Sequence, residues 1–249
     1  MVENNNQKLP LVSVVIPAWN SETTIRGTLD SLFNQTNADF EVIVVDDGST
    51  DKTAELVRTY GKGVRLISQE NQGSNPARNR GWREAQGRYL FFLDSDVALR
   101  ADCFEKLLAA LDAHPEASYA YASFRFGKKL FRLWPFDPER LRRMPFIHTG
   151  AMIRAEDFPG FDESIKRLQD WDVFLTMLER GKSGVWVSEV LFSVALREQG
   201  ISAWVPRWLY WIPWRFLGWK PKRVEKYEQA VRVIQQKHGL VLKKEKPFR

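Results

Sequence analysis

Short apolar runs that alternate with helix-forming segments constrain the fold of this chain more than any other feature. The runs are LVSVVIPAW at 11–19, FEVIVV at 40–45, VRLIS at 64–68 and RYLFFLD at 88–94. Segments with helical spacing follow them, at 20–34, 50–60, 76–85 and 102–113. Because consecutive parallel strands need a crossover helix, this alternation predicts an α/β fold with a mostly parallel central sheet and helices on both faces.

Three of the predicted strands end in polar or functional residues, at 17–20, 46–47 and 94–96. In open parallel sheets, ligands bind beyond the carboxyl ends of the strands, so we expect one crevice there. Asp47 is placed to accept hydrogen bonds from a base or sugar; the alternative is that it caps the following turn. Arg78 is predicted in the first turn of a helix, where a cation is disfavoured, and is either a ligand contact or a solvated side chain.

The stretch GRYLFFLDSD sets two carboxylates one residue apart after a buried run. Strand alternation would point Asp94 and Asp96 the same way, with Ser95 on the opposite side. Like charges this close repel unless a cation lies between them, and Mg²⁺ and Mn²⁺ prefer hard oxygen ligands. The pair therefore indicates a divalent cation and, with it, a phosphate; the alternative is a solvent-facing turn.

Charge is unevenly distributed along the chain. The segment 203–249 has 12 Lys or Arg and 3 Glu, a net charge of +9. Because the whole chain carries +6, residues 1–202 have a net charge of 6 − 9 = −3. We therefore predict three parts: a polar segment at 1–10, a catalytic domain at 11–202 and a basic, Trp-rich extension at 203–249 that contains an amphipathic helix.

Cysteine usage and hydropathy bear on location. The single cysteine, Cys103, excludes an internal disulfide and fits a reducing setting. The first ten residues lack the apolar core of a signal peptide, and no apolar run is long enough to span a bilayer. We expect a cytoplasmic protein, with the inner face of the cell membrane as a second option.

Five motifs in order, VSVVIPAWNSE, FEVIVVDDGSTD, NQGSNPARNRG, FLDSD and QDWD, resemble the family-two glycosyltransferases of the GT-A fold. The resemblance covers about residues 11–200. It implies a nucleotide-diphosphate-sugar donor, a divalent cation (Mg²⁺ or Mn²⁺) and inversion at the anomeric carbon. It places these residues in the donor site: Pro17, Ala18, Trp19, Glu22, Asp47, Arg78, Asp94, Ser95 and Arg197.

Roles follow from the same resemblance. Pro17, Ala18 and Trp19 would line the base of the nucleotide. Asp47 and Arg78 would also contact this nucleotide base. Asp94 would touch the ribose and Asp96 would bind the metal, with Arg197 as a second cation for the leaving group. Many family members carry histidine at the position of Gln199, so a third protein ligand to the metal is in doubt.

Asp170 in QDWD matches the general base of the family, although Gln169 replaces the acid that usually precedes it. A carboxylate at a helix start near the anomeric carbon suits that role. The alternative is that Asp170 and Asp172 only complement the helix dipole. His148 is a rival base.

Two basic aromatic segments remain. Residues 123–146 hold seven Arg or Lys and two acids. This segment either binds an acceptor that is anionic or carries a lipid phosphate, or it is a solvated loop. Five tryptophans lie at 204–219 among basic residues, which favours peripheral contact with a membrane through 204–223 over packing on the body. A helix with Val224 and Ile234 on one face, stopped by Gly239, is expected to dock on the body.

The sequence thus predicts an inverting, hexosyltransferase-type enzyme that moves a sugar to a hydroxyl of a glycan or lipid-linked acceptor in cell-envelope polysaccharide synthesis. The alternative function is a non-catalytic protein that binds membranes or nucleic acid through its tail. No nucleic-acid motif supports that binding, so nucleic acid is not an expected partner. A sugar-nucleotide pyrophosphorylase is a further rival, but no glycine-rich phosphate loop follows the first strand.

Overall fold

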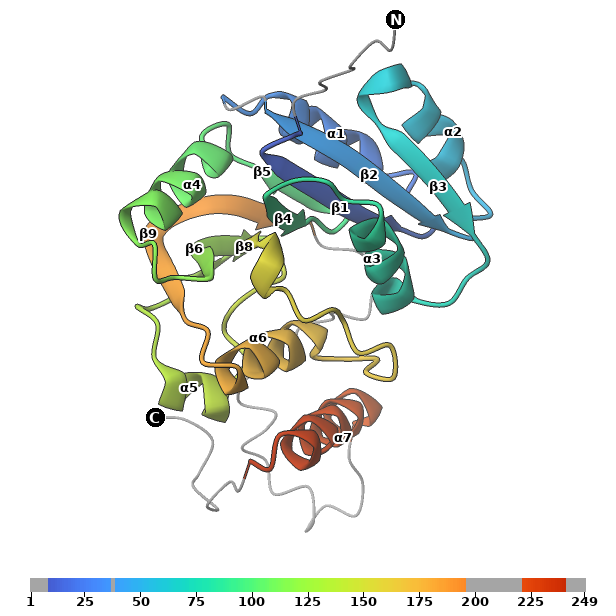
Figure 1. The fold of residues 1–249 in the computed structure, drawn as a ribbon. Helices are drawn as coiled ribbons and strands as arrows, with labels where there is room; N and C mark the ends of the chain where they lie inside the picture. Colours follow the sequence, from blue (N-terminus) through green and yellow to red (C-terminus); the bar gives the residue numbers. More distant parts are fainter. Residues whose placement is uncertain (1–8, 37–38, 196–220, 241–249) are drawn as a thin grey trace, which may run out of the picture.

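The computed structural model describes residues 9–36, 39–195 and 221–240. It contains one nine-stranded sheet, with helices on both sides (Figure 1). The strands are β1 (Val12–Ala18), β2 (Phe40–Asp47), β3 (Arg65–Gln69), β4 (Tyr89–Phe92), β5 (Val97–Leu99), β6 (Tyr119–Phe126), β7 (Lys129–Phe131), β8 (Met152–Arg154) and β9 (Gly184–Val194). The helices are α1 (Ile25–Phe33), α2 (Thr53–Arg58), α3 (Ser74–Arg83), α4 (Cys103–Ala113), α5 (Pro138–Arg143), α6 (Gln169–Glu179) and α7 (Lys222–Lys237).

The strand order is β3-β2-β1-β4-β8-β6-β9-β5, and β7 pairs with β6. The first four strands are parallel, so their carboxyl ends share one edge. The second half is mixed, because β8 runs antiparallel to both β4 and β6. Register places Ala18 opposite Asp46, and Asp47 opposite Gln69. The α/β prediction is confirmed.

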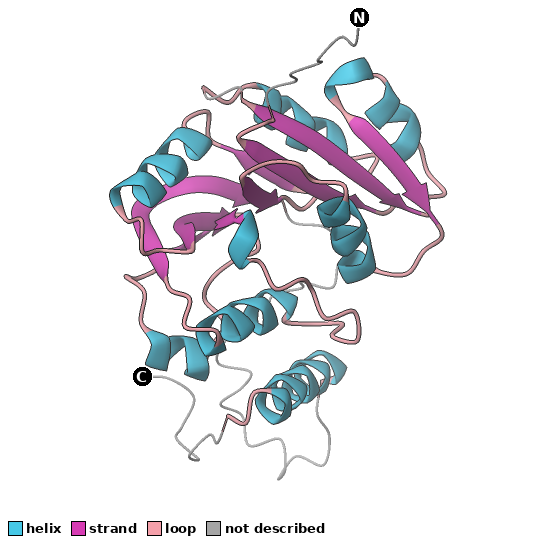
Figure 2. Ribbon diagram, in the orientation of Figure 1, coloured by secondary structure: helices cyan, strands magenta, loops and turns pink. Residues whose placement is uncertain are grey.

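Alternate residues of the buried strands pack against helices and loops on the two faces of the sheet. Ile43 and Val45 pack with Ala77 of α3. On β4, the ring of Phe91 contacts Phe104 of α4, whereas Phe92 contacts Phe158 on the other side. Figure 2 shows the resulting helix–sheet–helix layering.

Close packing of α3 needs a glycine. A Cβ at Gly81 would lie 2.4 Å from Cγ1 of Val15, well inside contact distance. The helix also begins at Ser74, two residues earlier than the sequence predicts. Arg78 therefore lies in the second turn and not, as predicted, in the first, so the argument from an unfavourable helix dipole at this position was wrong.

The second half of the chain adds α5, α6 and the β6–β7 hairpin. Asp137 caps α5 by accepting hydrogen bonds from the amides of Glu139 and Arg140. Helix α7 lies beside α6 (Figure 1), and its Val224 and Ile234 are fully buried. The predicted amphipathic helix is thus present, and Gly239 follows its end with a positive φ of 59°.

None of the helices in the described residues is long and apolar enough to cross a membrane. The predicted boundary at 203, the tryptophan-rich segment 204–219, Arg197 and Gln199 all lie outside those residues. The predictions attached to them stay predictions.

Candidate functional site

The loop after β1 carries an exposed tryptophan. Trp19 is 53% exposed, while Ala18 directly before it is buried. The next residue, Asn20, has a positive φ of 46°, and its side-chain oxygen accepts the amide of Thr50 at 2.9 Å. A non-glycine residue with positive φ is strained unless the surroundings impose it, and such strain clusters at ligand sites. The loop therefore presents an aromatic face at the edge where parallel strands end.

Glu22 supports the neighbouring loop. The side chain of Glu22 is exposed, and its Oε2 accepts the amide of Lys52 at 3.1 Å. In return, the amide of Glu22 donates to Asp51 at 3.0 Å. These bonds tie the β1 loop to the start of α2. The structure thus gives Glu22 a local structural role, and its predicted contact with the donor stays untested.

Asp46 and Asp47 both accept hydrogen bonds from backbone amides, and the predicted contact of Asp47 with the donor stays untested. Asp46 accepts the amide of Ser49 at 3.2 Å and so shapes the turn. Asp47 is 3% exposed and accepts three hydrogen bonds. They come from Gln69 Nε2 at 2.8 Å and from the amides of Gln72 and Gly73 at 2.9 and 2.8 Å. Asp47 therefore holds the loop that leads into α3.

Arg78 joins α3 to the acidic turn after β4. It is 6% exposed, and its Nη2 donates to Asp94 Oδ1 at 2.7 Å. Nη1 donates to Asn75 at 3.1 Å, and the guanidinium lies over the ring of Phe161. Its buried Nε has no hydrogen-bond partner. The alternative prediction, that Arg78 is a solvated side chain, is thus wrong. A buried donor without a hydrogen-bond partner is expected where a ligand binds.

The turn after β4 presents Asp94 and Asp96 at its surface and buries Ser95. Ser95 Oγ lies 2.9 Å from Ser21 Oγ, a contact that fixes the turn against the β1 loop. The carbonyl of Asp96 accepts the amide of Ala195 at 2.8 Å. Asp94 and Asp96 are half-buried on either side of the buried Ser95, but in a turn and not in the predicted strand. Ser95 therefore supports the turn, and its predicted contact with the donor stays untested.

Asp170, the second residue of α6, completes the crevice from the other half of the sheet. Burial raises the pKa of its carboxyl above the ordinary value, and Asp94 adds to this rise. His148, the amide of Trp171 and Arg78 act in the opposite direction but do not cancel it. Asp170 thus lies within electrostatic reach of Asp94 and Arg78, as the sequence predicts. A raised pKa makes a carboxylate a stronger base.

The rival base is already engaged. The amide of Gly150 donates to His148 Nδ1 at 3.0 Å. The imidazole also packs 5.2 Å from the rings of Phe124 and Phe192. His148 is thus held in place by its surroundings, and the choice of Asp170 over His148 as the base stays a prediction.

The residues before Asp170 are strained. Leu168 has a positive φ of 60°, and Gln169 Nε2 donates to the carbonyl of Lys166 at 3.2 Å. Among the described residues, Asn20 and Leu168 alone combine a side chain with positive φ. They lie next to Trp19 and close to Asp170, so backbone strain marks both halves of the candidate site.

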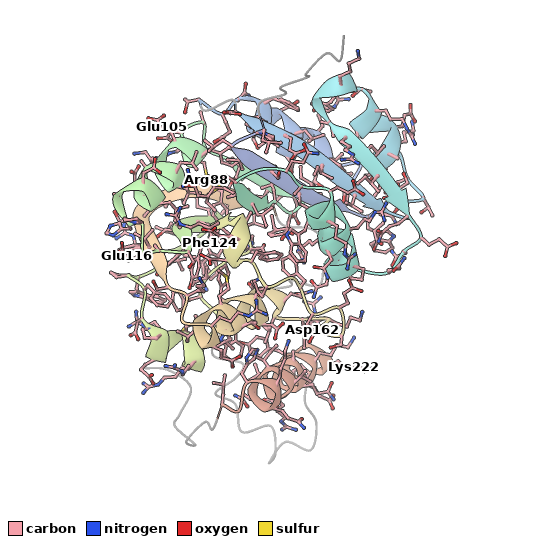
Figure 3. The ribbon with its side chains drawn as sticks, viewed as in Figure 1. Arg88, Glu105, Glu116, Phe124, Asp162 and Lys222 are labelled. Carbon is pink, nitrogen blue, oxygen red and sulfur yellow. The ribbon has the colours of Figure 1, made fainter. Side chains whose placement is uncertain are left out.

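Sequence reasoning missed the anchoring of α6. Asp172 is 2% exposed, and its carboxylate contacts Lys237 Nζ at 2.8 Å and His238 Nε2 at 2.8 Å. Lys237 also pairs with Asp162, which lies beside α7 in Figure 3. His238 in turn contacts Glu179 at 2.7 Å. No sequence signal pairs residues this far apart; the helical spacing of 224–234 only predicts that α7 docks somewhere.

Comparisons with known proteins agree with this arrangement. The family model described as "Glycosyl transferase family 2" matches residues 13–167, more than half of the chain. The chain is 31% identical over 210 residues to the putative teichuronic acid biosynthesis glycosyltransferase TuaG of Bacillus subtilis, covering 78% of this chain and 82% of that one. It is 35% identical over 193 residues to a chondroitin synthase of Pasteurella multocida. That match covers 72% of this chain and only 20% of the synthase.

Solved structures share the fold. TarS of Staphylococcus aureus in complex with UDP-GlcNAc superposes with a TM-score of 0.68 at 23% identity, over 78% of this chain and 61% of that one. The mannosyltransferase PcManGT of Pyrobaculum calidifontis, in complex with GDP-Man and Mn²⁺, superposes with a TM-score of 0.64 at 22% identity. That superposition covers 78% of this chain and 59% of PcManGT. At these identities, both show that the described sheet and helices share their fold.

Proposed function

The chain belongs to glycosyl transferase family 2 and has the GT-A fold, and from this premise we propose that it transfers a sugar from a nucleotide-diphosphate donor to a hydroxyl acceptor with inversion. One observation carries the proposal. Arg78 of α3, Asp94 of the turn after β4 and Asp170 of α6 come from three elements, yet Arg78 pairs with Asp94 and both act electrostatically on Asp170. Family membership and this grouping favour an enzyme over a protein that only binds membranes or nucleic acid.

The donor side is built by the ends of β1, β2 and β4. Trp19 offers an exposed ring on which the nucleotide base can stack. The buried Nε of Arg78 is a hydrogen-bond donor without a partner. Asp94 keeps one face toward solvent while it pairs with Arg78, so it is placed for a ribose hydroxyl. The complexes of TarS with UDP-GlcNAc and of PcManGT with GDP-Man support a nucleotide-sugar ligand for this crevice.

The chemical step needs one proton acceptor. Asp170 takes the proton of the acceptor hydroxyl as that oxygen bonds to the anomeric carbon from the side opposite the diphosphate. The bond from the anomeric carbon to the diphosphate oxygen breaks, and the nucleoside diphosphate leaves with the bonding electrons. Attack from the opposite side inverts the configuration. Because Asp170 has a raised pKa, it holds this proton more readily than a solvated aspartate would.

The donor set fits Mg²⁺ or Mn²⁺. Asp94 and Asp96 present oxygen ligands on one turn, and these ions take few protein carboxylates and complete their shell with phosphate and water. No group of three acidic, histidine or cysteine side chains is gathered for a metal among the described residues. When bound, the cation neutralises charge on the departing diphosphate. We assign Asp96 as its protein ligand and Arg197 as a second cation.

The acceptor and location are inferred more broadly. The relatives include a chondroitin synthase and a putative teichuronic acid glycosyltransferase, which supports a polysaccharide or lipid-linked acceptor in the cell envelope. The chain spans about a fifth of the length of that chondroitin synthase, so the synthase's whole activity is not carried over. We propose a cytoplasmic enzyme of residues 11–202, whose basic extension at 203–249 contacts the membrane surface through 204–223.

The test is donor binding and hydrolysis across a panel of nucleotide sugars, with and without Mn²⁺ or Mg²⁺. We expect one donor to bind in a metal-dependent way and Asp96→Ala to lose that dependence. Asp112→Ala is the matched control, because Asp112 is exposed on α4 and has no ion pair with the described residues. If no donor binds with either metal, the proposed function is wrong.

A further inference from the structure

An exposed tryptophan on the acceptor half of the molecule lies against one arginine, and two more arginines lie close to it in the sequence. Trp134 is 40% exposed, one of few large apolar side chains among the described residues to be so open. The guanidinium of Arg140 lies 4.5 Å from its ring centroid. Arg132 lies two residues before it, and Arg143 follows Arg140 by three positions on the same face of α5. We call Arg132, Trp134, Arg140 and Arg143 the Trp134 surface.

The indole of Trp134 is held in place. The hydroxyl of Tyr121 donates to the carbonyl of Trp134 at 2.7 Å, and Phe146 meets the ring edge-on at a centroid distance of 6.1 Å. Arg140 covers part of the ring. A side chain fixed on three sides gives up little conformational entropy when a ligand packs against it. Trp134 is therefore a preformed aromatic platform.

The positive charge of this surface is not neutralised within the described residues. Both acids of segment 123–146 are already in use, since Asp137 caps α5 and Glu139 pairs with Arg142. Arg132, Arg140 and Arg143 have no ion pair with any other described residue. An arginine guanidinium presents a planar fork that matches carboxylates and phosphates. The surface is thus suited to an anion.

The surface is linked directly to the proposed base. Trp171, the neighbour of Asp170, donates from its Nε1 to the carbonyl of Leu141 at 2.6 Å, and Leu141 lies in α5 between Arg140 and Arg143. On the other side, Phe146 precedes His148 by two residues, and His148 acts electrostatically on Asp170. A molecule lying on Trp134 would therefore extend toward the reacting hydroxyl.

We propose that the Trp134 surface is an acceptor subsite for an anionic glycan. This inference rests on the proposed function. Trp134 packs against a sugar ring, and Arg132, Arg140 and Arg143 bind the carboxylates or phosphates of the chain. A lipid surface is less suited, because membrane-interface segments present several apolar side chains together, whereas Trp134 is the single large one exposed on the described residues 123–146.

The experiment measures binding of unsulfated chondroitin oligosaccharides to the full chain, with carboxyl-reduced chondroitin of the same length and phosphatidylglycerol vesicles as the other two probes. We expect Trp134→Ala and Arg132→Gln/Arg143→Gln each to weaken chondroitin binding about tenfold, the size of a single good contact. Trp134→Tyr should retain most of the affinity. The matched control is Arg58→Gln/Lys62→Gln, two exposed cations at α2 and beyond, which should leave affinity within about twofold.

Three results would overturn the inference: equal affinity in the wild type and both test variants, equal affinity for the carboxyl-reduced probe, or binding of the vesicles alone. Nucleotide-sugar binding measured on the same samples separates the two proposals. If a donor binds and chondroitin does not, only the subsite is wrong. If no donor binds, the proposed function itself fails.

Discussion

The strand ends on the donor side and helix α6 stabilise their buried carboxylates in different ways. On the donor side, Asp46 and Asp47 accept amides from turns within 26 residues of them. On α6, Asp172 relies on Lys237 and His238, which lie 65 and 66 residues away at the end of α7. Strand ends therefore hold their acids by local backbone, whereas the helix with the proposed base is held by a distant helix.

Asp170 follows neither pattern. The adjacent amide of Trp171 donates to its Oδ1 at 2.9 Å, and burial raises the pKa of its carboxyl. Asp172, two residues later, is tightly paired. The difference separates a carboxylate kept available for chemistry from one spent on structure. Stability lost at a buried charge is the expected cost of an activated base.

The largest effect is expected from Asp170→Asn. Removal of a general base lowers rates by about 10²–10⁴-fold. Because the pKa of Asp170 is raised in the folded chain, its ionised form destabilises the fold above that pKa, and the neutral amide removes this cost. We expect kcat to collapse while the melting temperature holds or rises. An active variant would contradict the assignment of the base.

Asp47→Ala should have the next largest effect, now on stability. It leaves two loop amides and Gln69 without their acceptor, which we expect to cost about 2–3 kcal/mol. Denaturant unfolding measures this free energy. Asp46→Ala removes one longer bond and is the matched control, expected to cost about 1 kcal/mol. Equal losses would show that Asp47 does not organise the loop.

Asp172→Asn should loosen α7. The change removes one of the two charged partners of the partly buried Lys237 and of the buried His238, and leaves them Asp162 and Glu179. We expect this to cost about 1–2 kcal/mol after allowance for the solvent exposure of Lys237. Hydrogen exchange of the amides in 222–237 should accelerate more than exchange in β1. Glu179→Gln alters the exposed partner of His238 and should have a smaller effect. Unchanged exchange in α7 would show that the contact is dispensable.

The smallest effect is a pH dependence of the same contact. Burial lowers the pKa of His238, but hydrogen bonds to Asp172 and Glu179 outweigh it and the pKa rises above 6.5. The stabilisation is therefore complete below the unfolded pKa and is lost as pH rises through the folded one. The difference in melting temperature between wild type and His238→Gln should be larger at about pH 5.5 than at about pH 9. A constant difference would exclude this titration.

Much of this arrangement is readable from the sequence. The alternating strands and helices and the shared edge of strand ends follow from periodicity and from parallel-sheet geometry. The partnership of Arg78 with Asp94 does not, because α3 starts two residues earlier than the pattern suggests and brings the arginine to the crevice from its second turn.

Contacts across long separations could not be predicted. The Asp172–His238 pair joins two helices whose sequences each indicate only an apolar face. Likewise, nothing in the sequence shows that the amides of Gln72 and Gly73 fold back onto Asp47. Local patterns fix elements and their ends; the side-chain partners depend on how those elements pack.

The most direct test of the central claim is a crystal structure of the chain with Mn²⁺ and the donor selected by the binding panel. We expect the nucleotide base to lie against Trp19 and the ribose to lie at Asp94 near Arg78. The cation should bind Asp96, and the anomeric carbon should face Asp170. A donor bound elsewhere, or bound in the crevice with its anomeric carbon directed away from Asp170, would contradict it.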